Sequence, residues 1–372
     1  MLYLDNAATS FPKPACVLKE INFCLKKYCG NPGRSSHTLS VKASEAIYSA
    51  REKIAKMLGV IDPEHIVFTY NATYALNIAI KSLVRKRCHI LTSDFEHNSV
   101  IRPLEALRKK LKIEYSCFDT KVELKKSLQS GLRQETSGII ASLASNVTGD
   151  HTTLKLLSDF AKEKGLFLIV DASQAIGHMK INLNDAPCDA LCAPGHKALF
   201  GIQGCGFVYF KDKTRRESFI EGGSGYDSIS GEMPILLPEG YEAGTLSTPA
   251  IASLSSGVDF IEKIGLVNIH NKLNRLTEMT SERLSEISGI RLYKAGIGLL
   301  SFNYMDMPSS AFSSLLNERG ICVRGGLHCA PSIHKRLGTI DQGTVRVSYS
   351  YLNKMSDPDR LYKTVKSIIK EI

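Results

Sequence analysis

The chain of 372 residues lacks the features that mark membrane, secreted and repetitive proteins. No apolar run approaches the ~18 residues needed to cross a bilayer, so we expect no membrane association. The opening residues, Met-Leu-Tyr-Leu-Asp-Asn, have neither the basic region nor the apolar region of a signal peptide. Internal repeats and low-complexity tracts are also lacking. These absences favour an ordinary globular protein.

The cysteines and the net charge narrow the class further. Ten cysteines without a secretory signal suggest reduced thiols in a cytoplasmic setting. Cys188 and Cys192 lack a spacing suited to a zinc site with Cys205 or Cys322, so we expect no metal. The densest basic run, residues 108–112, closes a predicted helix, where cations complement the helix dipole. No nucleic-acid-binding signature accompanies the net charge of +10, so we expect no nucleic-acid partner.

Hydrophobic periodicity predicts an α/β protein. At 372 residues the chain is long for one core, which favours two domains. Short apolar segments alternate with amphipathic helical ones from residue 66 to 210. This alternation predicts a large domain with a mainly parallel, seven-stranded sheet flanked by helices. The expected strands are 66–69, 89–92, 113–118, 138–142, 166–170, 190–192 and 207–210, with helices at 73–84, 100–111 and 154–164 among them.

The C-terminal third predicts a smaller α+β domain. Residues 221–249 are rich in Gly, Ser and Pro, which is typical of a functional or disordered loop. We place the large domain at 14–250 and the small domain at 1–13 with 251–372. The small domain is expected to contain helices at 251–264, 267–287, 310–319 and 357–369, and strands at 290–293, 298–304 and 343–348.

Two residues near the ends of predicted strands suggest a cofactor. Ligands of parallel sheets bind beyond the carboxyl ends of the strands, where both Asp171 and Lys197 fall. An Asp that pairs with a protonated pyridine nitrogen and a Lys that forms a Schiff base are the protein groups that pyridoxal 5′-phosphate requires. Each has an ordinary alternative, because Asp171 could cap a turn and Lys197 could be a surface residue. The glycine-rich run 193–206 favours a ligand, and Gln174 could bond a phenolic oxygen.

Three further polar segments follow predicted strands. Residues 71–73 precede a helix, whose first turn can bind a phosphate, although Asn71 or Thr73 could also be a plain N-cap. His97 could stack on a flat aromatic cofactor or be a solvated loop residue. Asn146 is either a turn residue or a polar contact to the substrate.

Cys329 is the candidate nucleophile. Most free cysteines are small buried hydrophobes, but Gly and Pro residues flank Cys329 and imply an exposed loop. Arg324 and His328 lie close in sequence and could stabilise its thiolate, the nucleophilic form. Arg346, in Gly-Thr-Val-Arg-Val-Ser, could bind a carboxylate through two hydrogen bonds.

Seven segments of the sequence are similar to motifs of a known protein family. They are Tyr-Leu-Asp-Asn-Ala-Ala-Thr-Ser (3–10), Asn-Pro-Gly-Arg-Ser-Ser-His-Thr-Leu-Ser (31–40), Glu-His-Asn-Ser (96–99), Val-Asp-Ala-Ser-Gln-Ala (170–175), Gly-His-Lys (195–197), Glu-Ala-Gly-Thr (242–245) and Arg-Gly-Gly-Leu-His-Cys-Ala-Pro (324–331). Nearly end to end, the chain resembles the cysteine desulfurases and selenocysteine lyases of the class-V aminotransferase group. The compact Cys segment is similar to that of the second desulfurase group. The resemblance implies the fold type I aminotransferase-like architecture.

The resemblance also implies roles for residues that match the motifs. Lys197 would hold pyridoxal 5′-phosphate and move protons, and Cys329 would accept sulfur. The other cofactor contacts would be Asp171 to the pyridine nitrogen, Gln174 to the phenolic oxygen, His97 on the ring, and Ala72, Thr73 and His196 at the phosphate. Thr245 would reach the phosphate in a neighbouring subunit, which implies a homodimer. The substrate contacts would be Asn146 and Arg346 at the carboxylate, and Arg34 and Arg324 near the side-chain end.

Three positions depart from the family pattern. Pro194 replaces a phosphate-binding Ser or Thr, Leu327 replaces the first of two His before the cysteine, and Ile202 replaces a Pro. The expected function is the desulfuration of L-cysteine, with the sulfur passed to an acceptor protein. The alternatives are a selenocysteine lyase acting on L-selenocysteine and a cofactor-free persulfide relay. Iron–sulfur cluster assembly, tRNA thiolation and selenium metabolism all remain open as uses of the product.

Overall fold

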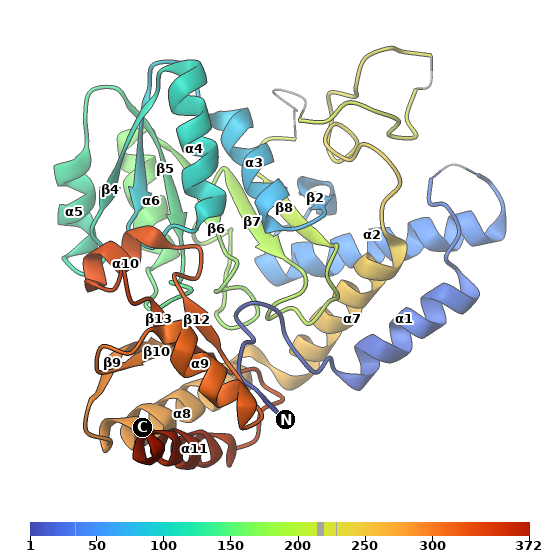
Figure 1. Ribbon diagram of the computed structural model, residues 1–372. Coiled ribbons are helices and arrows are strands. Elements are labelled where there is room, and N and C mark those ends of the chain that lie inside the picture. Colours follow the sequence, from blue (N-terminus) through green and yellow to red (C-terminus); the bar gives the residue numbers. More distant parts are fainter. Residues whose placement is uncertain (34, 214–218, 228) are drawn as a thin grey trace.

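The computed structural model describes residues 1–33, 35–213, 219–227 and 229–372 (Figure 1). Its larger sheet has seven strands, as predicted, and the α/β class is confirmed. All neighbouring strands in it are parallel except for the two pairings of β8. The strands lie in the order β2 (Ile66–Thr69), β8 (Gly206–Phe210), β7 (Ala190–Pro194), β6 (Phe167–Asp171), β5 (Thr136–Ser142), β3 (His89–Ser93) and β4 (Glu114–Phe118).

The reversed direction of β8 follows from the segment that precedes it. A parallel return needs a crossover of a dozen or more residues, usually through a helix. Only residues 195–205 separate β7 from β8, and they form tight turns instead. These turns return the chain to the carboxyl edge of the sheet, where Lys197 lies.

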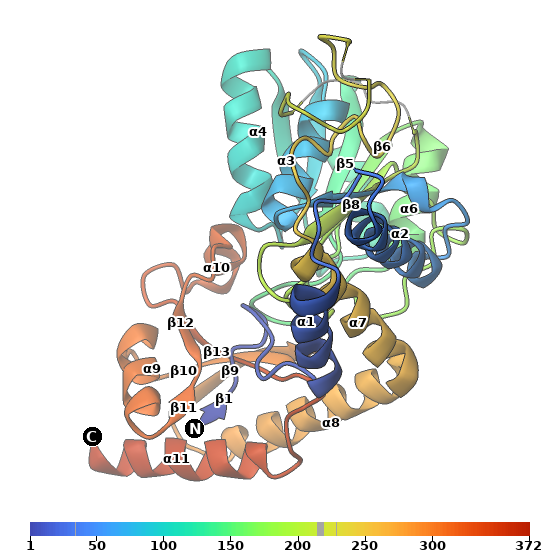
Figure 2. The ribbon, with the colours of Figure 1, turned by 90° about the vertical axis from the view of Figure 1, so that its right-hand side faces the viewer.

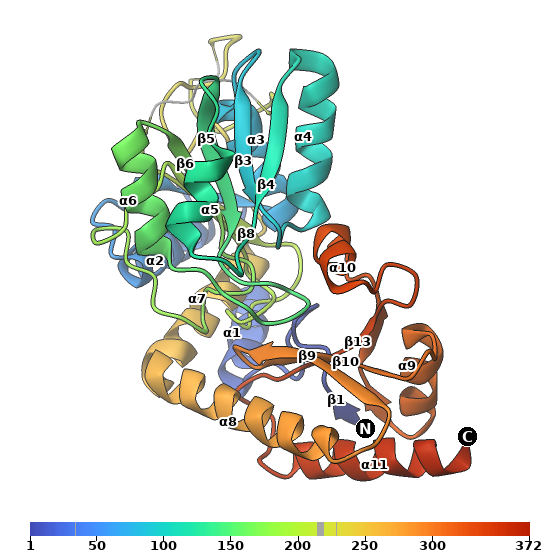
Figure 3. The same ribbon diagram turned by 90° about the vertical axis from the view of Figure 1, so that its left-hand side faces the viewer.

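Both faces of this sheet are buried, which explains its nearly continuous apolar strands. Ile169 packs on the face covered by α3 (Ala72–Leu83) and α4 (Asn98–Leu111), with Leu76 and Leu104. Its neighbour Val170 packs on the opposite face with Leu157 and Phe160. That face carries α2 (Thr38–Leu58), α5 (Leu124–Gly131) and α6 (Leu154–Lys164). Figure 3 shows α4 on one side of the sheet and α5 and α6 on the other.

A second, antiparallel sheet lies below the first in Figure 1. Its order is β12 (Arg324–Gly326), β13 (Thr344–Ser348), β10 (Leu299–Tyr304) and β9 (Ile290–Gly296). Beside it, the short β1 (Leu2–Tyr3) pairs with β11 (Ile321–Cys322). The accompanying helices are α8 (Leu266–Ser285), α9 (Ser309–Glu318) and α11 (Asp357–Glu371). Helix α10 (Pro331–Leu337) packs instead against Phe95 and Val147, which follow strands of the larger sheet.

Helix α7 (Thr248–Ile264) joins the two sheets (Figure 2). It packs against α2 and against α1 (Ala15–Lys27), and most of its side chains are buried. The sequence expectations did not include α1 or α2. Before α7, the described part of residues 221–247 forms neither a helix nor a strand, in agreement with the predicted loop. Among the described residues, no helix combines the length and apolarity that crossing a membrane would require.

Candidate active site

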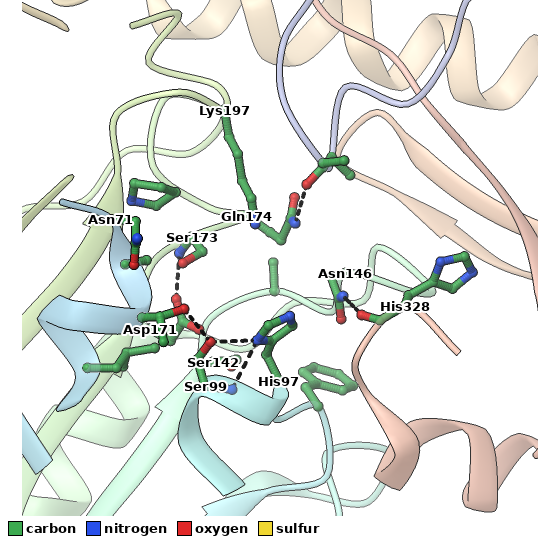
Figure 4. A pocket seen from close by; sticks show the side chains of 18 of the residues that line it. Asn71, His97, Ser99, Ser142, Asn146, Asp171, Ser173, Gln174, Lys197 and His328 are labelled. Carbon is green, nitrogen blue, oxygen red and sulfur yellow. Dashed lines mark hydrogen bonds between the residues drawn. The ribbon is translucent and has the colours of Figure 1, made fainter. Parts of the chain in front are cut away.

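The carboxyl ends of the parallel strands face the smaller sheet across a cavity of about 220 Å³ (Figure 4). Residues from both sheets and from the N-terminal segment line this cavity. The structure brings ten of the sequence-predicted residues to its wall: Ala72, Thr73, His97, Asn146, Asp171, Gln174, His196, Lys197, Arg324 and Arg346.

Lys197 and Asp171 come from adjacent strands of the larger sheet. Asp171 is the last residue of β6, and its Oδ1 accepts a hydrogen bond of 2.8 Å from the backbone N–H of Ser173. Lys197 lies three residues beyond β7. Burial is the main cause that lowers the pKa of the Lys197 amine to about 8; Asp171 opposes the shift, and Arg346 and Arg324 contribute to it. A less basic amine is a better nucleophile at neutral pH.

The start of α3 forms one end of the cavity. Asn71 is the N-cap, and its side chain accepts a 3.1 Å hydrogen bond from the N–H of Tyr74. Ala72 and Thr73 follow as the first helical residues, where backbone N–H groups have no partner within the helix. The capping interpretation and the phosphate-binding interpretation are therefore compatible. The positive end of the helix dipole makes this the natural place for an anion.

The imidazole of His97 is fixed by the helix that it caps. Its Nδ1 accepts from the N–H of Ser99 at 3.1 Å, so the ring proton resides on Nε2. Ser99 Oγ lies 2.9 Å from the same nitrogen and 2.8 Å from Thr73 Oγ1, which links the two ends of the site (Figure 4). Burial lowers the pKa of His97 to about 4, with Lys197 adding to the effect. The ring is thus neutral at physiological pH.

Gln174 and His196 complete the contacts on the larger-sheet side. Gln174 donates from Nε2 to the backbone oxygen of Ala7 at 3.1 Å, so the N-terminal segment forms part of the site. His196 Nδ1 is buried and finds no hydrogen-bond partner among the described residues. Burial lowers the pKa of His196 to about 4, which leaves a neutral ring.

Arg346 and Asn146 form the opposite side of the cavity. The Arg346 side chain is 1% exposed and donates from Nη1 to the backbone oxygen of Asn146 at 3.0 Å. Arg346 Nε and Asn146 Oδ1 are buried without a partner in the described structure. A buried polar atom without a partner is costly, so these atoms are suited to a polar ligand. Arg324 faces Arg346 directly across the β12–β13 pair.

Cys329 is exposed on the turn that follows β12. His328 and Cys329 both have left-handed backbone conformations, with φ of 51° and 58°, which non-glycine residues rarely adopt. The turn is held where Asn146 Nδ2 donates to the His328 oxygen at 2.7 Å and Asn98 N–H donates to the Cys329 oxygen at 2.8 Å.

Only one of the two groups expected beside the Cys329 thiolate reaches its sulfur. Arg324 Nη2 lies 3.7 Å from Sγ. The His328 ring is buried and directs Nε2 to the Thr344 backbone oxygen at 3.0 Å instead. The role of His328 is therefore to shape the turn, because packing against β13 turns its ring away from the thiolate.

Besides Cys329, which lies on the exposed turn, two predicted site residues are not placed at the wall of this cavity. Thr245 is exposed and lines a separate cavity of about 270 Å³ together with Arg51 and Glu242. Arg34 lies outside the described residues. In the part of the chain that the structure describes, no group of His, Cys, Asp and Glu side chains could hold a metal ion.

The three departures from the family pattern have different settings. Pro194, the last residue of β7, lines the main cavity, where its ring offers no hydrogen-bond donor. Ile202 is half-buried and donates its N–H to Ser253 Oγ at 2.9 Å. Leu327 is 37% exposed beside the cysteine turn.

Sequence reasoning missed Glu96, which is fully buried next to His97. Its carboxyl group accepts from Ser93 Oγ, from the Ser142 N–H at 2.8 Å and from Ser142 Oγ at 2.9 Å. Burial raises the pKa of Glu96 to about 7, and the nearby charge of Asp171 contributes. The Glu-His-Asn-Ser segment that drew attention to His97 could also have identified this acid.

Known proteins resemble this chain over nearly its whole length. The sequence profile of the family described as Aminotransferase class-V matches residues 2–361. The probable cysteine desulfurase of Methanothermobacter thermautotrophicus is 30% identical over 99% of this chain and 94% of its own length. The probable cysteine desulfurase of Halalkalibacterium halodurans is also 30% identical, over 98% of this chain and 92% of its own.

Solved structures show the same architecture. The apo structure of the cysteine desulfurase from Thermococcus onnurineus NA1 superposes with a TM-score of 0.93 and 28% identity. It covers all of this chain and 95% of that chain. The cysteine desulfurase CsdA from Escherichia coli superposes with a TM-score of 0.90 at 24% identity, over 100% of this chain and 95% of that one, and supports the fold. The expected fold type I aminotransferase-like architecture is confirmed.

Proposed function

The chain belongs to the class-V aminotransferase family, and we propose that it is a cysteine desulfurase dependent on pyridoxal 5′-phosphate. The enzyme would convert L-cysteine into L-alanine and retain the sulfur on Cys329 as a persulfide. One arrangement carries this proposal. A single cavity is lined by the Lys197 amine, the Asp171 carboxylate, the N-terminus of α3 and two arginines, Arg324 and Arg346. Cys329 Sγ lies 3.7 Å from Arg324 Nη2.

The residues of the cavity fit this cofactor. Lys197 has a desolvated amine for its aldehyde, and Asp171 has a buried carboxylate for its ring nitrogen. Ala72 and Thr73 at the start of α3, with the unpartnered Nδ1 of His196, suit its phosphate. When bound, pyridoxal 5′-phosphate acts as an electron sink for bonds around the substrate α-carbon. The missing hydroxyl at Pro194 leaves the helix N–H groups to hold more of the phosphate.

Arg346 and Asn146 would orient the substrate through its carboxylate. Arg346 Nε is one free donor on the buried guanidinium, and charge-assisted hydrogen bonds from arginine to carboxylate are strong and directional. The freed Lys197 amine would then remove the α-proton. Its lowered pKa makes this possible at neutral pH, because about a tenth of an amine with a pKa of about 8 is unprotonated at pH 7.

Cys329 would take the sulfur in a balanced exchange. Its thiolate forms an S–S bond as the substrate C–S bond breaks. The electron pair of the broken bond stays on carbon, which gains a proton and leaves as L-alanine, while the transferred sulfur is oxidised to the persulfide level. Arg324 Nη2, 3.7 Å from Sγ, would hold the sulfur of Cys329 in place for this exchange.

We further propose that the enzyme acts as a homodimer. Thr245 points into no part of the main cavity, and exposed apolar side chains surround it. Tyr48 shares one surface cavity with Thr245, and Tyr70, Tyr74 and Ile220 share another. A second copy that covers this surface would bring its own Thr245 towards the phosphate. We also propose that a sulfur-acceptor protein approaches the exposed Cys329 from outside. We further propose that the boundary between the large and the small domain lies at residue 250.

Two variants test the proposed function. Lys197→Ala should lose turnover, and reduction with borohydride should no longer attach the cofactor covalently to that segment by mass spectrometry. Cys329→Ala should keep the attached cofactor but lose alanine formation from L-cysteine by several orders of magnitude, as happens when an enzyme loses its nucleophile. Unimpaired cysteine turnover by Cys329→Ala would contradict the assignment.

Comparison of the two amino acids separates the alternatives. Selenium can leave without a thiol acceptor, so Cys329→Ala should retain activity towards L-selenocysteine. A wild-type protein that turns over only L-selenocysteine would be the lyase instead. A protein that carries persulfide but never binds pyridoxal 5′-phosphate would be a relay.

A further inference from the structure

The N-terminal arm, residues 2–13, runs from the smaller sheet to the loop that carries Lys197. At one end the Leu4 backbone oxygen accepts from the N–H of Ser348, on β13 of the smaller sheet, at 2.8 Å. At the other end the backbone oxygen of His196 accepts from Ser10 N–H at 3.0 Å and from Lys13 Nζ at 3.1 Å. Between these anchors the arm accepts the bond from Gln174 (Figure 4). The arm therefore contacts both sides of the proposed active site.

Asp5 has a firmly fixed backbone within this arm. Its carbonyl oxygen accepts from Tyr3 Oη at 3.1 Å, from Ala8 N–H at 3.1 Å and from Thr9 N–H at 3.4 Å. Asp5 also forms a parallel bridge with Ser348, which lies two residues beyond Arg346 on β13. These bonds fix where the Asp5 side chain starts, directly beside Arg346.

The carboxylate of Asp5 pairs with Arg346. Arg346 Nη2 lies 2.7 Å from Asp5 Oδ1, and the two side chains are 1% and 21% exposed. Because Arg346 Nη1 is bonded to the Asn146 oxygen, protein oxygens fix both terminal nitrogens and leave Nε without a partner. Ala7 and Ala8 line the main cavity whereas Asp5 does not, so Asp5 meets the guanidinium from behind.

The negative charge of Asp5 also affects the repulsion between Arg346 and Arg324. Arg324 lies directly opposite Arg346 across the two strands, and the proximity of the two cations is unfavourable. Asp5 opposes that repulsion at Arg346, while Arg324 lies against the sulfur of Cys329. The two arginines thus have different partners, one suited to a carboxylate ligand and the other to the thiolate.

We propose that Asp5 is a positioning residue for the substrate carboxylate: it holds the buried guanidinium of Arg346 in place at the wall of the cavity. This inference rests on the proposed function, in which Arg346 receives the carboxylate of an amino acid. It assigns Asp5 no contact with the substrate or the cofactor.

The test compares two amines that differ only in a carboxylate. The cofactor-loaded protein is titrated with L-alanine and with ethylamine, and binding is followed by the absorbance of the cofactor. Wild type should bind L-alanine much more tightly than ethylamine. Asp5→Ala should weaken L-alanine by roughly 10- to 100-fold, the scale of a hydrogen bond to a charged group, and leave ethylamine within about twofold.

Two further variants complete the design. Asp5→Asn keeps an Oδ1 acceptor and should restore most of the affinity for L-alanine. Asp259→Asn is the matched control, because it removes an exposed carboxylate that pairs with Lys53 outside the cavity lining, and it should change neither affinity. Ethylamine binding in the same preparation shows that each variant is folded and loaded.

The outcomes separate this inference from the function on which it rests. Equal weakening of both amines in Asp5→Ala, or no weakening of either, would overturn the role of Asp5 while wild type still discriminates between them. An Asp5→Asn variant as weak as Asp5→Ala would also overturn positioning through Oδ1. A wild-type protein that binds both amines equally would overturn the assignment of Arg346 itself.

Discussion

Glu96 shows how far burial changes the chemistry of a single residue. Three donors from Ser93 and Ser142 surround its carboxyl group, and no ion pair to Glu96 is seen among the described residues. Without a counter-ion, burial disfavours the charged form, which is why the pKa of Glu96 rises to about 7. Glu96 ties the end of β3 to the end of β5 and so supports the turn that carries His97.

The buried environment of Glu96 predicts that Glu96→Gln raises the free energy of unfolding by an amount that depends on pH. In the folded state Glu96 keeps its proton up to about pH 7, whereas in the unfolded chain it loses the proton near its usual pKa of 4.5. The folded state therefore binds more protons between these values, and stability falls as pH rises from about 4.5 to 7. Glutamine mimics the protonated acid and avoids the loss.

The expected result is a free energy of unfolding higher than wild type by a few kcal/mol at pH 8, and little changed at pH 4.5. Urea unfolding of the cofactor-free proteins at the two pH values measures it. A Gln variant that is less stable at pH 8 than wild type would show that Glu96 is charged and stabilising there.

For single residues, the sequence identified candidate site residues by their position near the ends of predicted strands. Asp171 and Lys197 could be predicted together because the carboxyl ends of parallel strands converge on one edge of a sheet. The partners of Asp5 and Glu96 could not, because each contact joins segments distant in the chain. Asp5 meets Arg346 at a separation of 341 residues, and Glu96 meets Ser142 at 46.

Among the helices and strands, α4 has an N-cap residue, His97, that both stabilises the helix and lies at the wall of the cavity. His97 accepts the N–H of Ser99 through Nδ1, as an Asn or Ser side chain would at this position. The same bond fixes the ring at the wall of the cavity. Stability and activity can therefore be separated by substitution.

We expect His97→Ala to lose about 1 kcal/mol of stability, the usual cost of a lost N-cap, and His97→Asn to retain most of it. Both variants should lose turnover with L-cysteine, because neither has a ring to lie against the cofactor. Chemical denaturation and alanine formation are the two measurements. Equal destabilisation by Ala and Asn would show that the imidazole stabilises through packing and not through the cap.

Prediction of the elements succeeded where periodicity was strong. The helix at 154–164 and the strand at 66–69 agree with α6 and β2 residue for residue. Helices α1 and α2 were not predicted, although both are amphipathic and pack against α7. The direction of β8 depended on the short turn before it, which the strand pattern alone does not specify.

For the whole molecule, the central question is whether one site draws residues from two chains. Thr245 lies outside the main cavity of its own chain, yet its motif implies a contact with phosphate. In the proposed homodimer, Lys197 and Thr245 at one site come from different subunits. A mixed dimer of two different single variants would then contain one wild-type site.

We expect Lys197→Ala and Thr245→Ala homodimers, after mixing and subunit exchange, to have more activity than the sum of the separate proteins. The reason is that the Thr245→Ala chain supplies Lys197 and the Lys197→Ala chain supplies Thr245. Mixing Lys197→Ala with Cys329→Ala is the comparison, since both residues belong to the same chain's site and no intact site forms. Strict additivity in the first mixture, with exchange verified by mass, would argue against a shared site.

The sequence by itself determined the α/β class, the strand ends and the family motifs, because these depend on local periodicity and short-range patterns. Tertiary structure decided which groups meet. It turned the His328 ring towards Thr344, kept Thr245 out of its own chain's cavity, and placed Asp5 behind Arg346. Such contacts depend on how two sheets and an N-terminal arm pack together, and no local pattern in the chain encodes that packing.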